Sequence, residues 1–169
     1  MLSLYAEPQD KGRLTAELAP SLPCIKGDAS QLRQVIHNLA QNALDAVHDR
    51  PDGHVTVRSS LAFTDAGKPR AVRLHIVDNG PGFAEKVLKR AFEPYVTTKT
   101  KGTGLGLAVV KKIADEHGAR ISLRNLHPAS DAGSPPEDGQ DGAVIGAQVS
   151  LSFSNLAPAT EPVPAGAKP

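Results

Sequence analysis

Two glycine-rich stretches decide how this chain folds and what it can bind: Asp78-Asn79-Gly80-Pro81-Gly82 and Gly102-Thr103-Gly104-Leu105-Gly106-Leu107. The first places a carboxylate beside a tight turn, where it can accept a hydrogen bond from an exocyclic amine. The second precedes an apolar helix, whose N-terminal N–H groups and dipole favour a phosphate. Alone, either stretch is more often a structural turn. Together they indicate a purine nucleotide site.

Each stretch has a functional and a plain structural interpretation. Functionally, Asp78 accepts from the adenine amino group, which favours ATP over GTP, and Gly80 and Gly82 leave space for the base. The structural alternative for Asp78 is an Asx turn. For Gly102, Gly104 and Gly106 the alternative is a hinge, which is compatible with phosphate binding at the same place.

A polar stripe runs along the helix predicted after residue 28. Asn38, Asn42 and Asp45 recur at i, i+4 and i+7, so they share one face. Asn is a modest helix former, and two of them one turn apart call for a reason. One explanation is that this face of the helix is simply exposed to solvent. The other is Mg²⁺ binding, because an amide oxygen suits Mg²⁺ when phosphates supply further ligands.

The composition bounds the class of protein. The chain has 169 residues, which fits one domain with a real core. A formal net charge of +1 gives no case for a nucleic-acid surface. One cysteine, Cys24, excludes a disulfide framework. No apolar run approaches the roughly 20 residues of a membrane span, so we expect this fragment not to contact a membrane.

Hydrophobic periodicity predicts alternating helices and strands. Helices are expected from the Asp28 N-cap to the turn at 51–53, as a short piece after Phe83, and over 105–117 with Gly118 as the C-terminal cap. Strands are expected over 13–18, 22–25, 54–63, 71–78, 121–126 and 144–153. This order predicts an α+β fold, a two-layer α/β sandwich whose mixed, mainly antiparallel sheet packs on helices.

The rest of the chain reads as linker, lid and loops. Residues 1–10 resemble a linker remnant, and 11–154 form the domain. A mobile lid is expected over about 83–103, where Thr98 and Lys99 are candidates for phosphate contacts. The segment 127–142 and the tail 155–169 are rich in Pro, Gly, Ala or Asp, and we expect both to be disordered.

These motifs resemble the catalytic ATP-binding domain of bacterial sensor histidine kinases, the Bergerat fold of the wider group that includes gyrase. Four boxes occur in family order: QVIHNLAQNALDA at 34–46, DNGPG at 78–82, FEPYVTTK at 92–99 and GTGLGL at 102–107. The details of the first and third boxes are most similar to the nitrogen-regulation (NtrY/NtrB) type. The resemblance covers about residues 27–153.

The resemblance implies ATP and Mg²⁺ as cofactors, and a role for each matching residue. Asn42 would coordinate Mg²⁺, and Asn38 would assist at the phosphates. Asp78 would bind the adenine amine, directly and with Gly82 through water. Lys99 would reach the terminal phosphates when the lid closes. The phosphate chain would lie in the cradle Gly102, Thr103, Gly104, Leu105, Gly106 and Leu107.

Two departures from the family pattern matter. Many members carry a cation and then an aromatic residue just after the second Asn, whereas this chain has Asp45 and Ala46. One phosphate contact and one stacking ring are therefore missing. ATPases of the wider group carry a Glu where this chain has Asn38. An amide has no basicity to activate water, which argues for a kinase over a hydrolase.

The resemblance further implies partners outside this chain. None of the six histidines has the context of a phosphoacceptor, so we expect that group on an upstream dimerisation domain, with relay to the Asp of a response regulator. We expect the fragment to be monomeric, to bind ATP without autophosphorylation, and to be a cytoplasmic domain of a homodimeric parent, itself an inner-membrane protein in many sensor kinases. A nucleotide-responsive binding module and a serine kinase of the same superfamily are the alternative functions.

Overall fold

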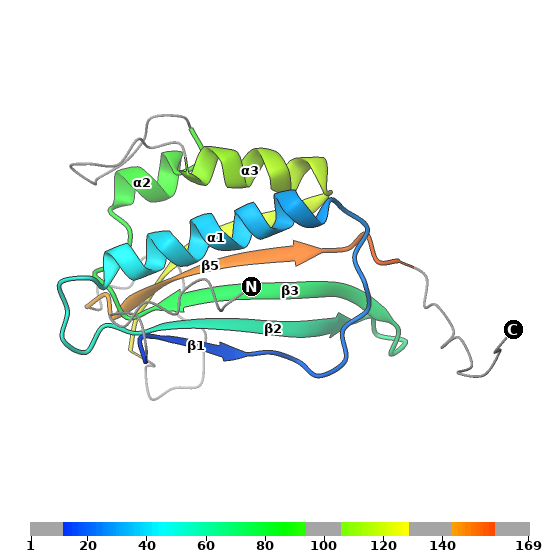
Figure 1. Ribbon diagram of the computed structural model, residues 1–169, viewed down its shortest axis with the longest axis horizontal. Helices are drawn as coiled ribbons and strands as arrows, with labels where there is room; N and C mark the ends of the chain where they lie inside the picture. Colours follow the sequence, from blue (N-terminus) through cyan, green and yellow to red (C-terminus); the bar gives the residue numbers. More distant parts are fainter. Residues whose placement is uncertain (1–11, 94–105, 129–142, 158–169) are drawn as a thin grey trace, which may run out of the picture.

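A computed structural model describes residues 12–93, 106–128 and 143–157. Its centre is a five-stranded sheet in the order β1-β2-β3-β5-β4, with helices on one face (Figure 1). The elements are β1 (Leu14–Glu17), α1 (Ala29–Ala46), β2 (Val55–Phe63), β3 (Pro69–Asp78), α2 (Glu85–Arg90), α3 (Gly106–Glu116), β4 (Ala119–Leu126) and β5 (Gly146–Phe153). The predicted two-layer α/β sandwich is confirmed.

The sheet is mixed, as predicted. β1 pairs with β2 in parallel, and α1 forms the crossover between them. The pairs β2–β3, β3–β5 and β4–β5 are antiparallel. Because β5 lies between β3 and β4, its first residues come next to the last residues of β3, where the first glycine turn begins.

Helix α1 begins where the sequence predicts. The Asp28 carboxylate accepts hydrogen bonds from the N–H groups of Ser30 (2.7 Å) and Gln31 (2.9 Å), which is N-cap geometry. Its apolar face lies against the sheet and buries Val35, Leu39, Ala40, Ala43 and Leu44. Helix α3 ends at Glu116, and Gly118 follows with φ of +61°, as expected for a C-terminal cap glycine.

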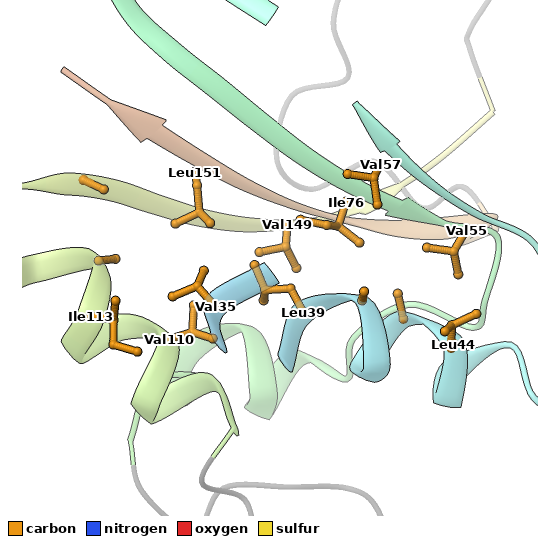
Figure 2. Close-up of a cluster of buried hydrophobic side chains, with 14 of the residues drawn as sticks. Val35, Leu39, Leu44, Val55, Val57, Ile76, Val110, Ile113, Val149 and Leu151 are labelled. Atoms are coloured by element: carbon orange, nitrogen blue, oxygen red, sulfur yellow. The ribbon is translucent and has the colours of Figure 1, made fainter. Parts of the chain in front are cut away.

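The core lies between the sheet and the helices α1 and α3. Figure 2 shows Leu39 and Val110 of the helices pointing toward Ile76, Val149 and Leu151 of the sheet. These side chains are aliphatic and almost completely buried, with exposed fractions between 0% and 7%. Each buried aliphatic side chain of this size stabilises the fold by roughly 1.5–3 kcal/mol, so burial of the inner sheet face fixes the strand register.

Pairing continues beyond the domain boundary predicted at residue 154. The N–H of Lys26 donates to the carbonyl of Asn155 (2.9 Å), and the N–H of Ala157 donates to that of Cys24 (2.7 Å). Ile25 and Leu156 form an isolated bridge between them. Residues 155–157 are therefore structured, whereas the sequence predicted disorder from 155 onward. The short strand predicted over 22–25 is reduced to this one bridge.

The remaining segment predictions lie mostly outside the described residues. This holds for residues 1–10, for the lid from 94 onward, for 129–142 of the predicted insertion and for 158–169. Within the described part of the lid, α2 matches the short helix predicted after Phe83. No helix among the described residues combines the length and apolar character that crossing a membrane requires.

Candidate functional site

Asp78 ends β3 with its side chain on the helix-covered side of the sheet. It is 7% exposed, and its Oδ1 accepts a hydrogen bond from the N–H of Gly80 (2.9 Å). Burial raises the pKa of the Asp78 carboxyl, and hydrogen bonds from the backbone of Gly80 and Ala147 oppose that rise. The Asx-turn contact leaves the Asp78 carboxylate able to accept from a further donor, since a carboxylate accepts more than two hydrogen bonds.

Gly80 and Gly82 shape the turn after Asp78, and each would be crowded by a side chain. A Cβ on Gly80 would lie 2.8 Å from Asp78 Oδ1 and 3.2 Å from the carbonyl oxygen of Ala46. Gly82 has φ of +79°, and a Cβ there would lie 2.5 Å from Val144 Cγ1. The two glycines let the turn lie close to both α1 and the chain entering β5.

Ala46, at the end of α1, faces this turn. Its Cβ would be 3.3 Å from a Cβ placed on Gly80. The sequence singled out position 46 because an aromatic residue is common there in the family it resembles. A small side chain at this place keeps the end of α1 close to the turn and provides no ring for stacking on a base.

Two asparagines that were not among the predicted site residues contact the backbone on either side of the turn. Asn79 Oδ1 accepts from the N–H of His54 (2.7 Å), and its Nδ2 donates to the carbonyl of Asp52 (2.8 Å). Asn125 Oδ1 accepts from the N–H of Phe83 (2.7 Å), and its Nδ2 donates to the carbonyl of the same residue (2.9 Å).

Gly146, at the start of β5, was also missed. A Cβ on it would lie 2.1 Å from the carbonyl oxygen of Asp78, so only glycine lets β5 approach the end of β3. A glycine at the start of a predicted strand is a signal for such close backbone approach. For Asn125 the signal was a polar residue at a position where strand alternation predicts an inward-facing side chain.

The second glycine stretch meets the polar stripe of α1. Gly106 begins α3, and a Cβ on it would lie 3.6 Å from Asn42 Nδ2 and 3.9 Å from Asn42 Oδ1. The structure therefore brings Asn42 and the N-terminus of α3 together. Asn38 lies one turn earlier on α1 and is half-buried. The Leu107 side chain packs against the core, which leaves its backbone for any phosphate contact.

Six predicted site residues lie outside the described residues, so the structure places none of them. These are Thr98, Lys99, Gly102, Thr103, Gly104 and Leu105. The seven described ones fall into two groups, Asp78 with Gly80 and Gly82 at the first turn, and Asn38, Asn42, Gly106 and Leu107 at the meeting of α1 and α3. Both groups lie on the helix side of the sheet.

The far ends of α1 and α3 are joined by a buried histidine. His117 Nε2 accepts a hydrogen bond from the N–H of Asp28 (2.9 Å), and Nδ1 is 2.8 Å from the carbonyl oxygen of Ile113. A backbone N–H can only donate, so Nε2 is the acceptor here, and the tautomer with the ring proton on Nδ1 satisfies both contacts. Gly27 allows this contact, because a Cβ there would lie 2.3 Å from His117 Cδ2.

The structure combines a two-layer sandwich, a buried carboxylate at a glycine turn and the Asn42 amide beside the N-terminus of α3. This combination is typical of one class of ATP-binding domain. The family model described as "Histidine kinase-, DNA gyrase B-, and HSP90-like ATPase" matches residues 27–154, and the chain belongs to this family.

Within the family, the most informative likenesses are to sensor histidine kinases. The sensory histidine kinase/phosphatase NtrB of Rhizobium leguminosarum bv. phaseoli is 40% identical over 135 residues, which cover 70% of this chain and 35% of that protein. The nitrogen regulation protein NtrY of Azorhizobium caulinodans is 32% identical over 158 residues, which cover 90% of this chain and 18% of that protein.

A solved structure matches at the level of the single domain. The nucleotide-free catalytic domain of histidine kinase ThkA has a TM-score of 0.66 and 27% identity, with 91% of this chain and 87% of that chain covered. The likeness to NtrB- and NtrY-type kinases that the sequence motifs indicated is therefore confirmed. This chain spans about a third of the length of NtrB and less of NtrY.

Proposed function

We propose that this chain is the catalytic ATP-binding domain of an NtrB/NtrY-like sensor histidine kinase. In this proposal it binds ATP with Mg²⁺ and donates the γ-phosphoryl group to a histidine on a dimerisation domain. The phosphoryl group then passes to an aspartate of a response regulator. The observation that carries the proposal is Asp78, a buried carboxylate held by the glycine turn and facing α1.

Adenine recognition rests on the first turn. The Asp78 carboxylate accepts from the exocyclic amine of adenine, and guanine presents a carbonyl oxygen at the same ring position. Two acceptors facing each other are repulsive, so GTP is rejected. Ala46 contributes no stacking ring, and Gly80 and Gly82 let the turn pack closely against Ala46 and Val144 beside the carboxylate.

The phosphates lie where α1 meets α3 in this proposal. Asn42 provides an amide oxygen for Mg²⁺, Asn38 assists at the phosphates, and the N-terminus of α3 at Gly106 faces the negative charge. When bound, Mg²⁺ neutralises charge that develops on the transferred group. Thr98, Lys99 and Gly102–Leu105 complete the cradle by resemblance to the family.

Transfer to a protein acceptor, and not to water, follows from Asn38. An amide in place of a carboxylate leaves water without a general base, so the γ-phosphoryl is retained for the histidine. We expect slow or no ATP hydrolysis by this chain, and no autophosphorylation without the dimerisation domain. Turnover comparable to that of dedicated ATPases would contradict this assignment.

Calorimetric titration of ATP·Mg²⁺ and GTP·Mg²⁺ into wild type and Asp78→Asn tests the site. We expect ATP binding that GTP lacks, weakened in Asp78→Asn by about 1–3 kcal/mol for a hydrogen bond to a charged group. Adding an NtrB-type dimerisation domain in trans then tests transfer. Acid-labile phosphohistidine supports the kinase, whereas ATP binding without transfer indicates a nucleotide-responsive module.

A further inference from the structure

The sheet has a second face that carries no described helix. Along each strand successive side chains alternate between the two faces. Val57, Ile76, Val149 and Leu151 point toward α1 and α3 (Figure 2). Their neighbours in sequence therefore point the other way. We name this surface the open face. It is independent of the nucleotide site, which lies on the helix side.

The strand register brings arginines together on the open face. Arg73 of β3 lies in one row across the sheet with Ser60, Ser152 and Arg120. Arg58 lies in the next row with Glu17, His75, Ser150 and Ser122. Arg124 pairs with Gln148 in the row after that. All four arginines are exposed.

Positive charge on this face is largely uncompensated. Arg58 donates to Glu17 (2.6 Å), which is the one acidic residue in these rows. Arg124 donates to the neutral side-chain oxygen of Gln148 (2.9 Å). Among the ion pairs of the described residues, none includes Arg73 or Arg120.

His75 lies among the arginines of the open face. Its Nδ1 lies 2.8 Å from Ser150 Oγ. Burial lowers the pKa of His75, and the charges of Arg73, Arg124 and Arg58 lower it further. Glu17, across Arg58 from His75, is the acidic group of the same row. His75 therefore reports any negative charge that arrives at the open face.

The side chains between the arginines are small. Serines occupy positions 60, 122, 150 and 152, where β-branched residues are usual on an exposed sheet. Because Ser60 and Ser152 are short, the guanidinium groups of Arg73 and Arg120 are accessible, and their fork geometry suits carboxylates. Neighbouring strands lie about 4.8 Å apart, so Arg73 and Arg120, two strands apart in one row, are about 10 Å from each other.

The residue types on the open face favour one class of anionic partner over others. The aromatic ring in the rows named above is the imidazole of His75, which is half-buried and lies 2.8 Å from Ser150 Oγ, so these rows offer bases no exposed stacking platform. None contains a large exposed apolar side chain of the kind that inserts into a lipid surface. We propose that the open face is a docking surface for an acidic protein, whose Asp and Glu carboxylates pair with Arg73 and Arg120, while the charges of Arg124 and Arg58 add to the attraction.

The probe for this surface is a synthetic twelve-residue peptide of alternating Asp, Glu and Ser, titrated at low salt without nucleotide. The readouts are affinity by fluorescence anisotropy and the NMR titration of His75. We expect the peptide to raise the pKa of His75, because nearby negative charge favours the imidazolium. We expect binding to weaken at least tenfold in Arg73→Ser/Arg120→Ser.

Arg33→Ser/Lys112→Ser removes the same charge from α1 and α3 and is the matched control. It should change affinity less than twofold. Equal weakening in both double variants, or an unchanged His75 titration, would overturn the proposal. Tighter binding to duplex DNA or to phosphatidylserine vesicles than to the peptide would also overturn it. None of these outcomes depends on ATP binding, so they stand apart from the proposed kinase function.

Discussion

Asn125 of β4 holds Phe83 by both of its backbone polar groups, with the side-chain oxygen 2.7 Å from the Phe83 nitrogen and the side-chain nitrogen 2.9 Å from its oxygen. This two-point contact joins the end of β4 to the turn after Asp78. A Cβ on Gly82 would lie 2.8 Å from the same Asn125 oxygen. Asn125 thus fixes the turn that the nucleotide base would contact.

Replacement of Asn125 should therefore weaken nucleotide binding. Asn125→Ala leaves both Phe83 groups without their partner, and we expect a loss of about 1–3 kcal/mol in stability. Adenosine and ATP should lose affinity by the same factor, because the turn contacts the base and not the phosphates. Asn125→Asp keeps the acceptor for the Phe83 N–H and should retain more affinity. A lower melting temperature with unchanged affinities would reduce Asn125 to a structural residue.

We expect Asp78→Asn to weaken ATP binding without lowering the stability of the unliganded chain. Because the folded-state pKa of Asp78 is raised above 3.8, the folded chain holds more protons than the unfolded chain between those two values. Stability from this group therefore falls as pH rises through that window. Asparagine does not titrate, so Asp78→Asn lacks this loss of stability with rising pH. The unliganded variant should therefore be at least as stable as wild type at pH 7.

Thermal unfolding of wild type and Asp78→Asn across pH measures this difference, which should disappear below about pH 3.8, the ordinary value for Asp. The same variant should bind ATP less tightly, as described above. A variant that is clearly less stable than wild type at pH 7 would show that the carboxylate is needed for the fold, mainly through its bonds from Gly80 and Ala147.

Gly82 and Gly67 form a matched pair for measuring crowding at the first turn. Both have positive φ, +79° and +73°. A Cβ on Gly67 would meet nothing within 4 Å, whereas one on Gly82 would lie 2.5 Å from Val144 Cγ1. Gly67→Ala should cost about 1 kcal/mol from backbone conformation alone. Gly82→Ala should cost a further 1–3 kcal/mol or so from overpacking, as read from chemical denaturation. Equal losses would mean that the turn moves freely away from Val144.

We expect His117, which packs against Gly27, to stabilise the fold by linking the start of α1 to the end of α3. His117→Ala leaves the Asp28 N–H and the Ile113 carbonyl without this partner, and we expect a loss of about 2–3 kcal/mol. His48→Ala, at an exposed position, is the control and should stay within about 0.5 kcal/mol of wild type.

Gly27→Ala adds a Cβ that would contact His117, so it should destabilise wild type and have little effect in the His117→Ala background. A double-mutant cycle on unfolding free energies measures that coupling. Additive effects of the two substitutions would show that the Gly27 contact is relieved by small backbone shifts.

Local patterns predicted the elements well because their causes are local. The Asp28 cap, the α1 face with Leu39 and the Gly118 cap all depend on residues within a few positions of each other. For the candidate site, the motifs marked Asp78 and Asn42 from the sequence, and their roles stay predictions. The supporting contacts of the site were not predicted, because they join positions far apart in sequence.

Asn125 and Gly146 illustrate that limit. Asn125 meets Phe83 across 42 positions, and Gly146 meets Asp78 only because β5 lies beside β3. Neither fact follows from periodicity. The bridge between Ile25 and Leu156 was missed for the same reason, since 131 positions separate its partners. Composition alone predicted disorder where a distant backbone supplied hydrogen bonds.

The strand order has a consequence for how the domain assembles. The β2–β3 pairing begins at Phe63 and Pro69, close in sequence, whereas Ile76 and Val149 of β3 and β5 must find each other across 73 positions. Loop closure of that length is slow, so two preformed hairpins dock late in folding. Asp78 obtains its neighbours Ala147 and Gly146 only in that docking step. Half-folded chains therefore lack the complete surroundings of Asp78, and a nucleotide that binds there would stabilise fully assembled molecules selectively.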